Sequence, residues 1–127
     1  MTSETFYDQV GGHETFRRLA RQFYAGVAVD PELRALYPRG DLGPAEIRFR
    51  MFLEQYWGGP ATYSQERGHP RLRMRHAPFK ITITQRDRWL KHMMAAVDSL
   101  GLASGDDLIL RDYFGQAAQS LVNSLED

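Results

Sequence analysis

The chain has 127 residues, a length that suits one domain with a core of its own. Sixteen basic residues balance sixteen acidic ones, so the net charge gives no reason to expect binding to nucleic acid or to a membrane surface. There is no cysteine, which excludes disulfides, thiolate nucleophiles and thiolate metal sites. Neither a signal-peptide pattern nor an apolar run of about 18 residues is present, so we expect a cytoplasmic protein without a membrane span.

Helical periodicity begins after the glycine pair at 11–12. The residues that repeat at helical spacing are Phe16, Leu19, Phe23 and Val27. The helix should end before Asp30 and Pro31, because an aspartate can cap a following helix and a proline fits its first turn. We therefore expect a short second helix over 31–37.

The next helix should begin at Pro44 and run to residue 57, where the two glycines and the proline at 58–60 end it. Residues 61–83 show no helical period. An irregular stretch of that length inside a compact domain is uncommon unless it has a function. Residues 80–84, with the sequence KITIT, are the candidate for a strand.

Two further helices are predicted towards the C-terminus. Thr84 and Asp87 have the spacing of a capping box, which predicts a helix over 85–100 that Gly101 ends. The last helix should cover roughly 106–124. Its expected buried residues are Ile109, Tyr113, Phe114, Ala117, Leu121 and Val122. The sequence therefore predicts an all-α fold class in a single domain over 1–127.

The segment HPRLRMRHAPF, residues 69–79, concentrates positive charge. It places three arginines between His69 and His76, and no acidic residue occurs from 67 to 86. Such a run can be a solvated loop, a nucleic-acid contact or a grip on a small anion. The neutral net charge and the absence of a nucleic-acid-binding motif argue against the second. Arginine binds carboxylates through two hydrogen bonds, so a dicarboxylate cofactor would fit the third.

The four histidines do not form a zinc pattern. His69 and His76 are seven residues apart in irregular chain, which matches no close zinc spacing. His13 and His92 fall on predicted helices, where we expect them to be exposed or hydrogen-bonded. An isolated His76 is most often structural, but a single neutral imidazole beside carboxylate-binding residues is also what a haem iron requires.

Three polar aromatic residues, Tyr24, Tyr37 and Trp89, lie on or beside predicted apolar helix faces. Each can be a core residue whose polar tip bonds to the backbone. Together they could instead direct two hydroxyls and one indole N–H at a buried polar ligand. The motifs G-x-S-x-G, H-E-x-x-H and the P-loop do not occur, so the residues give no support to a hydrolase.

Three long matches give the chain a family resemblance. The segments FYDQVGG, FYAGVAVDPELRALYP and RMFLEQYWGGPATYSQERGHPRLRMRHAPFKI resemble the truncated haemoglobins of the second group, the O type, as found in actinobacteria. The resemblance covers about residues 5–124. It implies a truncated globin, a two-over-two helical sandwich around haem b. In that family an extended loop replaces most of the helix that carries the iron ligand, which would account for residues 61–83.

The resemblance also implies roles for residues on the proximal side. His76 matches the iron ligand. Arg75 matches a partner of the haem propionates, with Tyr63 and Arg48 as helpers. Arg67 and His69 are further candidates for the same role.

On the distal side, the resemblance makes Tyr24, Tyr37 and Trp89 the donors to a bound ligand. Phe52 and Leu53 would form an apolar wall. The resemblance also places Ala45 and Phe49 on the distal side. Ala45 is small enough to leave an entry route for the ligand, and close relatives often carry leucine at the position of Phe49.

The function implied is reversible binding of oxygen, CO and nitric oxide, with slow release of oxygen. The alternative is a haem enzyme, peroxidase-like or nitric-oxide-oxidising, that takes electrons from an unidentified reductase. A third hypothesis is a module without haem that binds a partner through the basic loop. A homodimer would be in keeping with the family.

Overall fold

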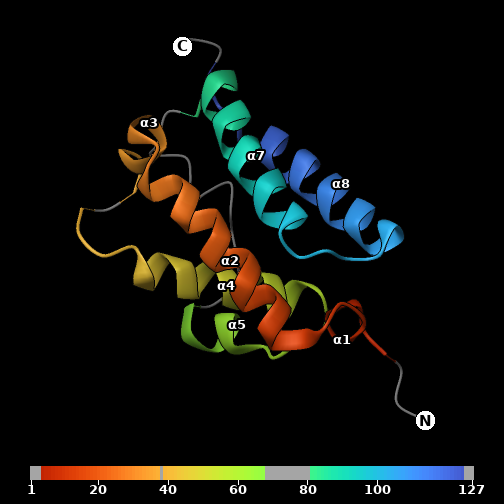
Figure 1. The fold of residues 1–127 in the computed structure, drawn as a ribbon. Coiled ribbons are helices and arrows are strands. Elements are labelled where there is room, and N and C mark those ends of the chain that lie inside the picture. The colour runs from red at the N-terminus through yellow and green to blue at the C-terminus, as the bar shows by residue number, and fades with distance from the viewer. Residues whose placement is uncertain (1–3, 38, 68–80, 125–127) are drawn as a thin grey trace.

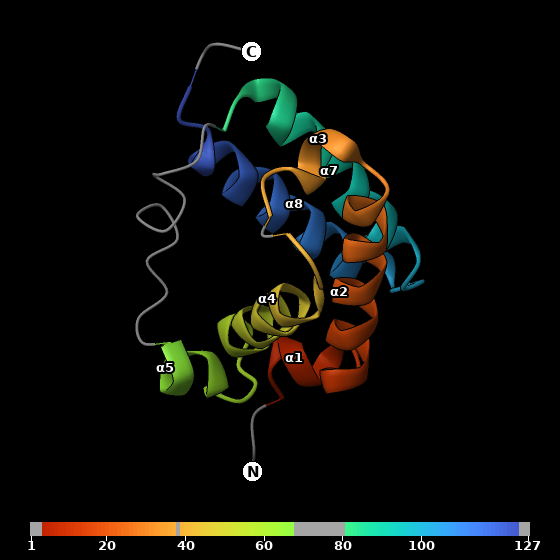
Figure 2. The ribbon, with the colours of Figure 1, turned by 90° about the vertical axis from the view of Figure 1, so that its left-hand side faces the viewer.

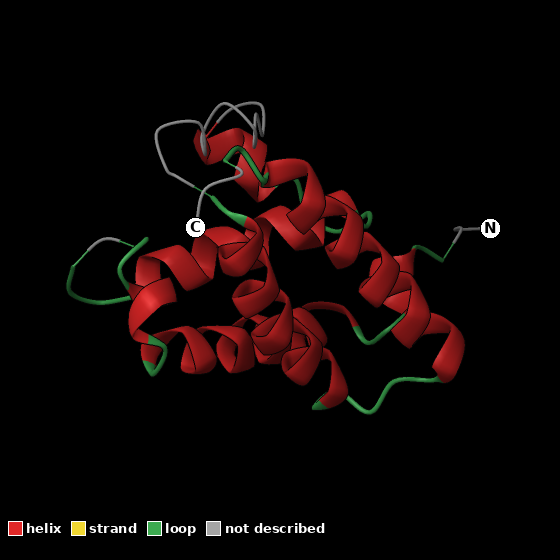
Figure 3. Ribbon diagram, turned by 90° about the horizontal axis from the view of Figure 1, so that it is seen from above, coloured by secondary structure: helices red, strands yellow, loops and turns green. Residues whose placement is uncertain are grey.

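The computed structural model describes residues 4–37, 39–67 and 81–124, and within these ranges every regular element is a helix (Figures 1 and 3). The helices are α1 (Phe6–Gln9), α2 (Gly12–Ala28), α3 (Pro31–Arg34), α4 (Gly43–Tyr56), α5 (Thr62–Arg67), α7 (Ile83–Asp98) and α8 (Ser104–Leu121). The expected all-α class is confirmed. None of the helices in the described ranges is long and apolar enough to cross a membrane.

The four long helices form two pairs, α2 with α4 and α7 with α8, and the two pairs pack against each other. Helix α2 contacts both α4 and α7, and α7 contacts α8. Figures 1 and 2 show α7 and α8 antiparallel, and Figure 1 shows α2 crossing α4. The short helices attach to this frame, with α1 against α2, α3 against α2 and α7, and α5 against α4. The two-over-two arrangement is therefore confirmed.

The core joins the two pairs. All four residues of the predicted apolar face of α2 are fully buried, as expected. The other helices contribute Leu53, Met93, Val97, Leu110 and Phe114. In α8 the predicted burial of Ile109 is wrong, since its side chain is 45% exposed and Leu110 is buried instead. Successive helix positions differ by about 100°, so one step along the sequence exchanges an inward for an outward side chain.

Two glycine pairs make the sharp turns that the resemblance implies. Gly11 and Gly58 have φ angles of 114° and 92°, in the left-handed region that favours glycine. At Gly59 a side chain would not fit, because a Cβ there would lie 2.8 Å from the Tyr7 ring. These turns bring α1 against the end of α4, where Tyr7 N–H donates to the Trp57 carbonyl at 3.0 Å.

Helix α7 begins two residues earlier than predicted. The cap is Thr82, whose side-chain oxygen accepts from Gln85 N–H at 3.1 Å, whereas Thr84 lies inside the first turn. The strand suggested for residues 80–84 is also wrong for the part that the structure describes. Ile81 precedes the helix and donates its N–H to Asn123 Oδ1 at 2.8 Å.

Helix α5 lies inside the stretch predicted to be irregular. Six residues are too few to show a helical period, so the sequence carries no local signal for this helix. Contacts with α4 hold it instead. Ser64 N–H donates to Gln55 Oε1 at 2.9 Å and Gln55 Nε2 donates to Ser64 Oγ at 2.7 Å. Tyr63, on the same helix, is buried and packs against Phe52.

Candidate functional site

A cavity of about 460 Å³ lies between the two helix pairs. Its volume falls in the range of about 300–1,000 Å³ that is usual for cofactor and ligand sites. Nine predicted site residues line it: Tyr24, Tyr37, Ala45, Arg48, Phe49, Phe52, Leu53, Tyr63 and Trp89. These are all of the predicted residues whose side chains the structure describes. The fold thus brings together residues that are up to 65 positions apart in the chain.

The remaining predicted residues cannot be placed. His69, Arg75 and His76 lie outside the described residues, as does the side chain of Arg67. The iron ligand and part of the propionate-binding set therefore stay predictions. Among the residues that are described, no group of three or more histidines, cysteines, aspartates and glutamates could hold a metal ion.

One wall of the cavity belongs to α8 and to the start of α7, which the sequence did not assign to the site. The added residues there are Ile81, Gln85, Arg86, Tyr113, Phe114, Ala117, Ala118 and Leu121. Tyr113, Phe114, Ala117 and Leu121 were predicted as core only. The sequence feature that could have indicated this wall is the pair Ala117–Ala118. Two small residues in an otherwise apolar helix leave space beside the helix for a ligand. Arg86 adds a second guanidinium to the border of the cavity, and it also donates to Gln119 of α8.

Phe49 lies at the centre of the aromatic wall. Its ring contacts Phe23, Tyr24, Trp89 and Phe114, with centroid distances of 5.6 to 6.5 Å. The contacts with Tyr24 and Trp89 are edge-on, an arrangement that aromatic pairs favour. Phe49 thus contacts both polar residues of the cavity wall and the buried core residues Phe23 and Phe114.

Tyr24, Tyr37 and Trp89 form one interacting group. The Tyr24 hydroxyl and the Trp89 indole both interact with the Tyr37 hydroxyl, and all three residues line the cavity. The Tyr24 and Tyr37 rings meet edge to face, 5.6 Å apart. The polar groups of the three residues thus gather at the wall of one cavity.

Both hydroxyls stay protonated over the physiological pH range. Burial raises the pKa of Tyr24, and the neighbouring Tyr37 raises it further. Burial also raises the pKa of Tyr37, although its interactions with Tyr24 and Trp89 oppose the shift. Burial raises the pKa of Tyr113, on the opposite wall, to about 12. The cavity thus offers neutral hydrogen-bond donors rather than a base.

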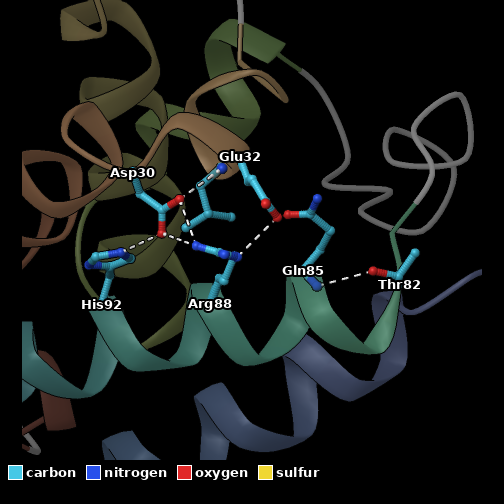
Figure 4. Close-up of polar contacts among 7 residues, drawn as sticks. Asp30, Glu32, Thr82, Gln85, Arg88 and His92 are labelled. Atoms are coloured by element: carbon cyan, nitrogen blue, oxygen red, sulfur yellow. Dashed lines mark hydrogen bonds and ion pairs between the residues drawn. The ribbon is translucent and has the colours of Figure 1, made fainter. Parts of the chain in front are cut away.

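A charged cluster joins the start of α3 to α7 (Figure 4). The buried carboxylate of Asp30 caps α3 by accepting from Leu33 N–H at 3.3 Å. It also accepts from His92 Nε2 at 2.9 Å and from Arg88 Nη1 at 3.2 Å. Arg88 Nε makes an ion pair with Glu32 at 3.1 Å. His92 is thus hydrogen-bonded, as expected, and so is His13, whose Nδ1 lies 2.9 Å from a Glu54 carboxylate oxygen.

Asp30→Asn is expected to remove a pH-dependent part of the stability. The hydrogen bond from His92 is the main cause that lowers the pKa of Asp30 in the fold. The stabilisation is therefore complete above the unfolded-state pKa of about 3.9 and is lost as the pH falls through the folded-state pKa. Asparagine caps a helix as well as aspartate, so the substitution tests the charge.

The measurement is urea unfolding of both proteins from about pH 6 to about pH 3, a window that spans the aspartate pKa. We expect a difference in unfolding free energy of about 1–3 kcal/mol at pH 6, the range for hydrogen bonds to a charged group. The difference should shrink towards pH 3. A difference that is constant with pH would show that the Asp30 charge does not contribute.

Comparisons with known proteins agree with this geometry. The family model for bacterial-like globins matches residues 5–123. A group 2 truncated haemoglobin from Bacillus subtilis is 39% identical over 115 residues, which cover 91% of this chain and 86% of that protein. The crystal structure of a thermostable haemoglobin from the actinobacterium Thermobifida fusca is 61% identical, with a TM-score of 0.95, and the match covers 97% of this chain and 100% of that one. A truncated oxygen-avid haemoglobin from Bacillus subtilis is 38% identical, with a TM-score of 0.88, over 94% of this chain and 100% of that one.

Proposed function

The chain belongs to the group II truncated haemoglobins, and we propose that its cavity holds haem b and binds oxygen, CO and nitric oxide reversibly. When bound, haem b supplies an iron with an open position for a diatomic gas. The observation that carries the proposal is that three polar aromatic residues, Tyr24, Tyr37 and Trp89, line one apolar cavity.

The described residues fit a haem. An apolar macrocycle with two carboxylates needs an apolar slot with cations at its border. Phe52, Leu53 and the alanines of α8 supply the slot, while Arg48 and Arg86 supply guanidinium groups at the same cavity. Arginine suits carboxylates because its planar fork can donate two parallel hydrogen bonds.

The distal group would slow the release of oxygen. A fixed donor in a dry pocket would stabilise oxygen held there, because the oxygen would carry partial negative charge. Tyr37 interacts with Tyr24 and Trp89 at the cavity wall, and we propose that its hydroxyl is the donor. One such bond contributes about 1 kcal/mol, and more to a charged partner, which slows dissociation several-fold. The relative described as oxygen-avid supports this assignment.

Absorption spectra of the reduced, oxygenated and CO-bound protein test the proposal. We expect a five-coordinate ferrous spectrum that changes on addition of either gas, and oxygen dissociation that is slow compared with that of a pocket without donors. A purified protein that is colourless and takes up no hemin would overturn it. Turnover of peroxide or nitric oxide with an added reductant is the measurement that separates gas binding from redox catalysis at the same site.

We propose further that Arg75 binds a haem propionate and that Arg75→Ala accelerates hemin loss. The expected cost is about 1–3 kcal/mol, the range for hydrogen bonds to charged groups, or about 5- to 150-fold in rate. The measurement is hemin transfer to an excess of an apo-globin acceptor, with the iron spectrum unchanged. Arg21→Ala, at an exposed position of α2, is the control. Transfer at the wild-type rate would assign the propionates to Arg48, Arg67 or Tyr63 instead.

A further inference from the structure

Two separate links join α7 to the segment that carries Tyr37. One is the interaction of Trp89 with the Tyr37 hydroxyl at the wall of the cavity that both residues line. The other is the cluster of Asp30, Arg88 and His92, none of which lines that cavity (Figure 4). Because both links span the same pair of elements, a change in the cluster alters how Trp89 and Tyr37 meet at the cavity.

The segment between Asp30 and Tyr37 can transmit such a change. Backbone hydrogen bonds run along it without a break, from Arg34 N to Asp30 O at 2.8 Å and from Tyr37 N to Arg34 O at 3.1 Å. Leu33 is fully buried in the core and anchors the middle of the segment. The Tyr37 backbone is thus fixed to the position of Asp30 through less than two helical turns.

On α7 two residues of the cluster, Arg88 and His92, flank Trp89 in the sequence. Arg88 precedes Trp89 directly, and His92 lies one turn further on, so both groups share the stretch of helix that carries the indole. The His92 ring is itself held from the other side by α2. A Cβ built on Gly26 would lie 2.4 Å from His92 Nδ1 and 3.2 Å from its Cβ, so the ring and the two helices are in close contact.

We propose that Asp30, Arg88 and His92 act as positioning residues that set the placement of Trp89 against Tyr37. The cluster holds α3 and α7 at the separation at which both side chains line one cavity. That placement directs their polar groups at a ligand in the cavity. The effect on gas release rests on the proposed function, whereas the effect on the indole does not.

Gly26→Ala tests the proposal without changing a charge. The added methyl must displace the His92 ring and, with it, the bond to Asp30. Gly115→Ala is the matched control, since it is also inside a helix and its Cβ would meet nothing within 4 Å. The chain has two tryptophans, so the purified protein in its CO complex gives two indole N–H signals in a ¹H–¹⁵N spectrum. Trp89→Phe assigns them, and the Trp57 signal is the internal reference.

We expect Gly26→Ala to move or broaden the Trp89 indole signal and to leave that of Trp57 in place. Oxygen dissociation should become about fivefold faster, which corresponds to roughly 1 kcal/mol. Gly115→Ala should change neither quantity. A Trp89 signal at its wild-type position in Gly26→Ala would overturn the proposal.

A second pair of variants separates positioning from packing. His92→Leu removes the donor to Asp30, whereas His92→Gln keeps an Nε2–H donor on a side chain of similar reach. We expect the leucine variant to behave like Gly26→Ala and the glutamine variant to restore the wild-type signal and rate. Equal effects of leucine and glutamine would overturn the proposal. If the protein binds no gas, the proposed function fails, and the indole signal, recorded without CO, still decides the role of the cluster.

Discussion

His76→Gly is expected to abolish the five-coordinate ferrous spectrum, and added imidazole is expected to restore it. The chain has four histidines and no cysteine. His13 and His92 are bound to the carboxylates of Glu54 and Asp30, and neither lines the cavity. Loss of a hydrogen-bond partner of a metal ligand already costs about 10- to 100-fold in affinity, so loss of the ligand itself should lower hemin affinity by more than about 100-fold.

The control for His76→Gly is His69→Gly, which removes the other histidine of the basic segment. That variant should keep the ferrous and CO spectra, because the resemblance gives His69 a role towards a propionate. The measurement is a titration of each apo-protein with hemin, followed by reduction and addition of CO. Wild-type spectra in His76→Gly would contradict the assignment, and their loss in His69→Gly alone would transfer the iron to His69.

The long helices were predictable because their signals are local. A repeat of apolar residues over four turns and a glycine or proline at the end define α2 and α4 without reference to the rest of the chain. The boundaries of α7 and the existence of α5 were not predictable in this way. Thr82 and Thr84 are both threonines at a plausible cap position, and only the packing of the first turn selects between them.

The family resemblance predicted which residues form the site, but it did not predict the contacts that they make with one another. The motifs that match the family point to Tyr24, Tyr37 and Trp89, and the structure places all three at one cavity. No sequence pattern indicates how the polar groups of these three residues lie relative to one another. That arrangement depends on the separation of three helices, which side chains far from the motifs determine. Arg86 was missed for the same reason, since its contact with α8 joins residues 33 positions apart.

Tyr37→Phe and Trp89→Phe together should show which residue donates to oxygen in the cavity. Tyr37→Phe deletes the hydroxyl that we propose as the donor, and Trp89→Phe deletes the indole N–H that interacts with this hydroxyl. Each variant keeps an aromatic ring, so packing changes little. A loss of roughly 1.4 kcal/mol in either one raises the oxygen dissociation rate about tenfold. Carbon monoxide should respond less, because it carries less negative charge for a donor to stabilise.

The double variant separates a direct from an indirect role of Trp89. If Trp89 acts by holding Tyr37, its replacement has no further effect once the Tyr37 hydroxyl is gone, and the two effects are not additive. If the indole donates to the ligand itself, the two effects multiply, to about a hundredfold for two tenfold steps. The interaction of the indole with the Tyr37 hydroxyl favours the first outcome. Stopped-flow measurement of oxygen dissociation, with CO dissociation alongside, gives the required rates.

Trp57→Phe is the matched control for these variants. It makes the same change of side chain in a half-buried residue that packs on the core but does not line the cavity. Its oxygen and CO dissociation rates should stay close to those of the wild type. If the rates in Trp89→Phe and Tyr37→Phe also stay within about twofold, or 0.4 kcal/mol, neither residue donates to the ligand. The interacting group would then serve only to order the core, and slow oxygen release would have to depend on how readily the ligand escapes past Ala45 and Phe49.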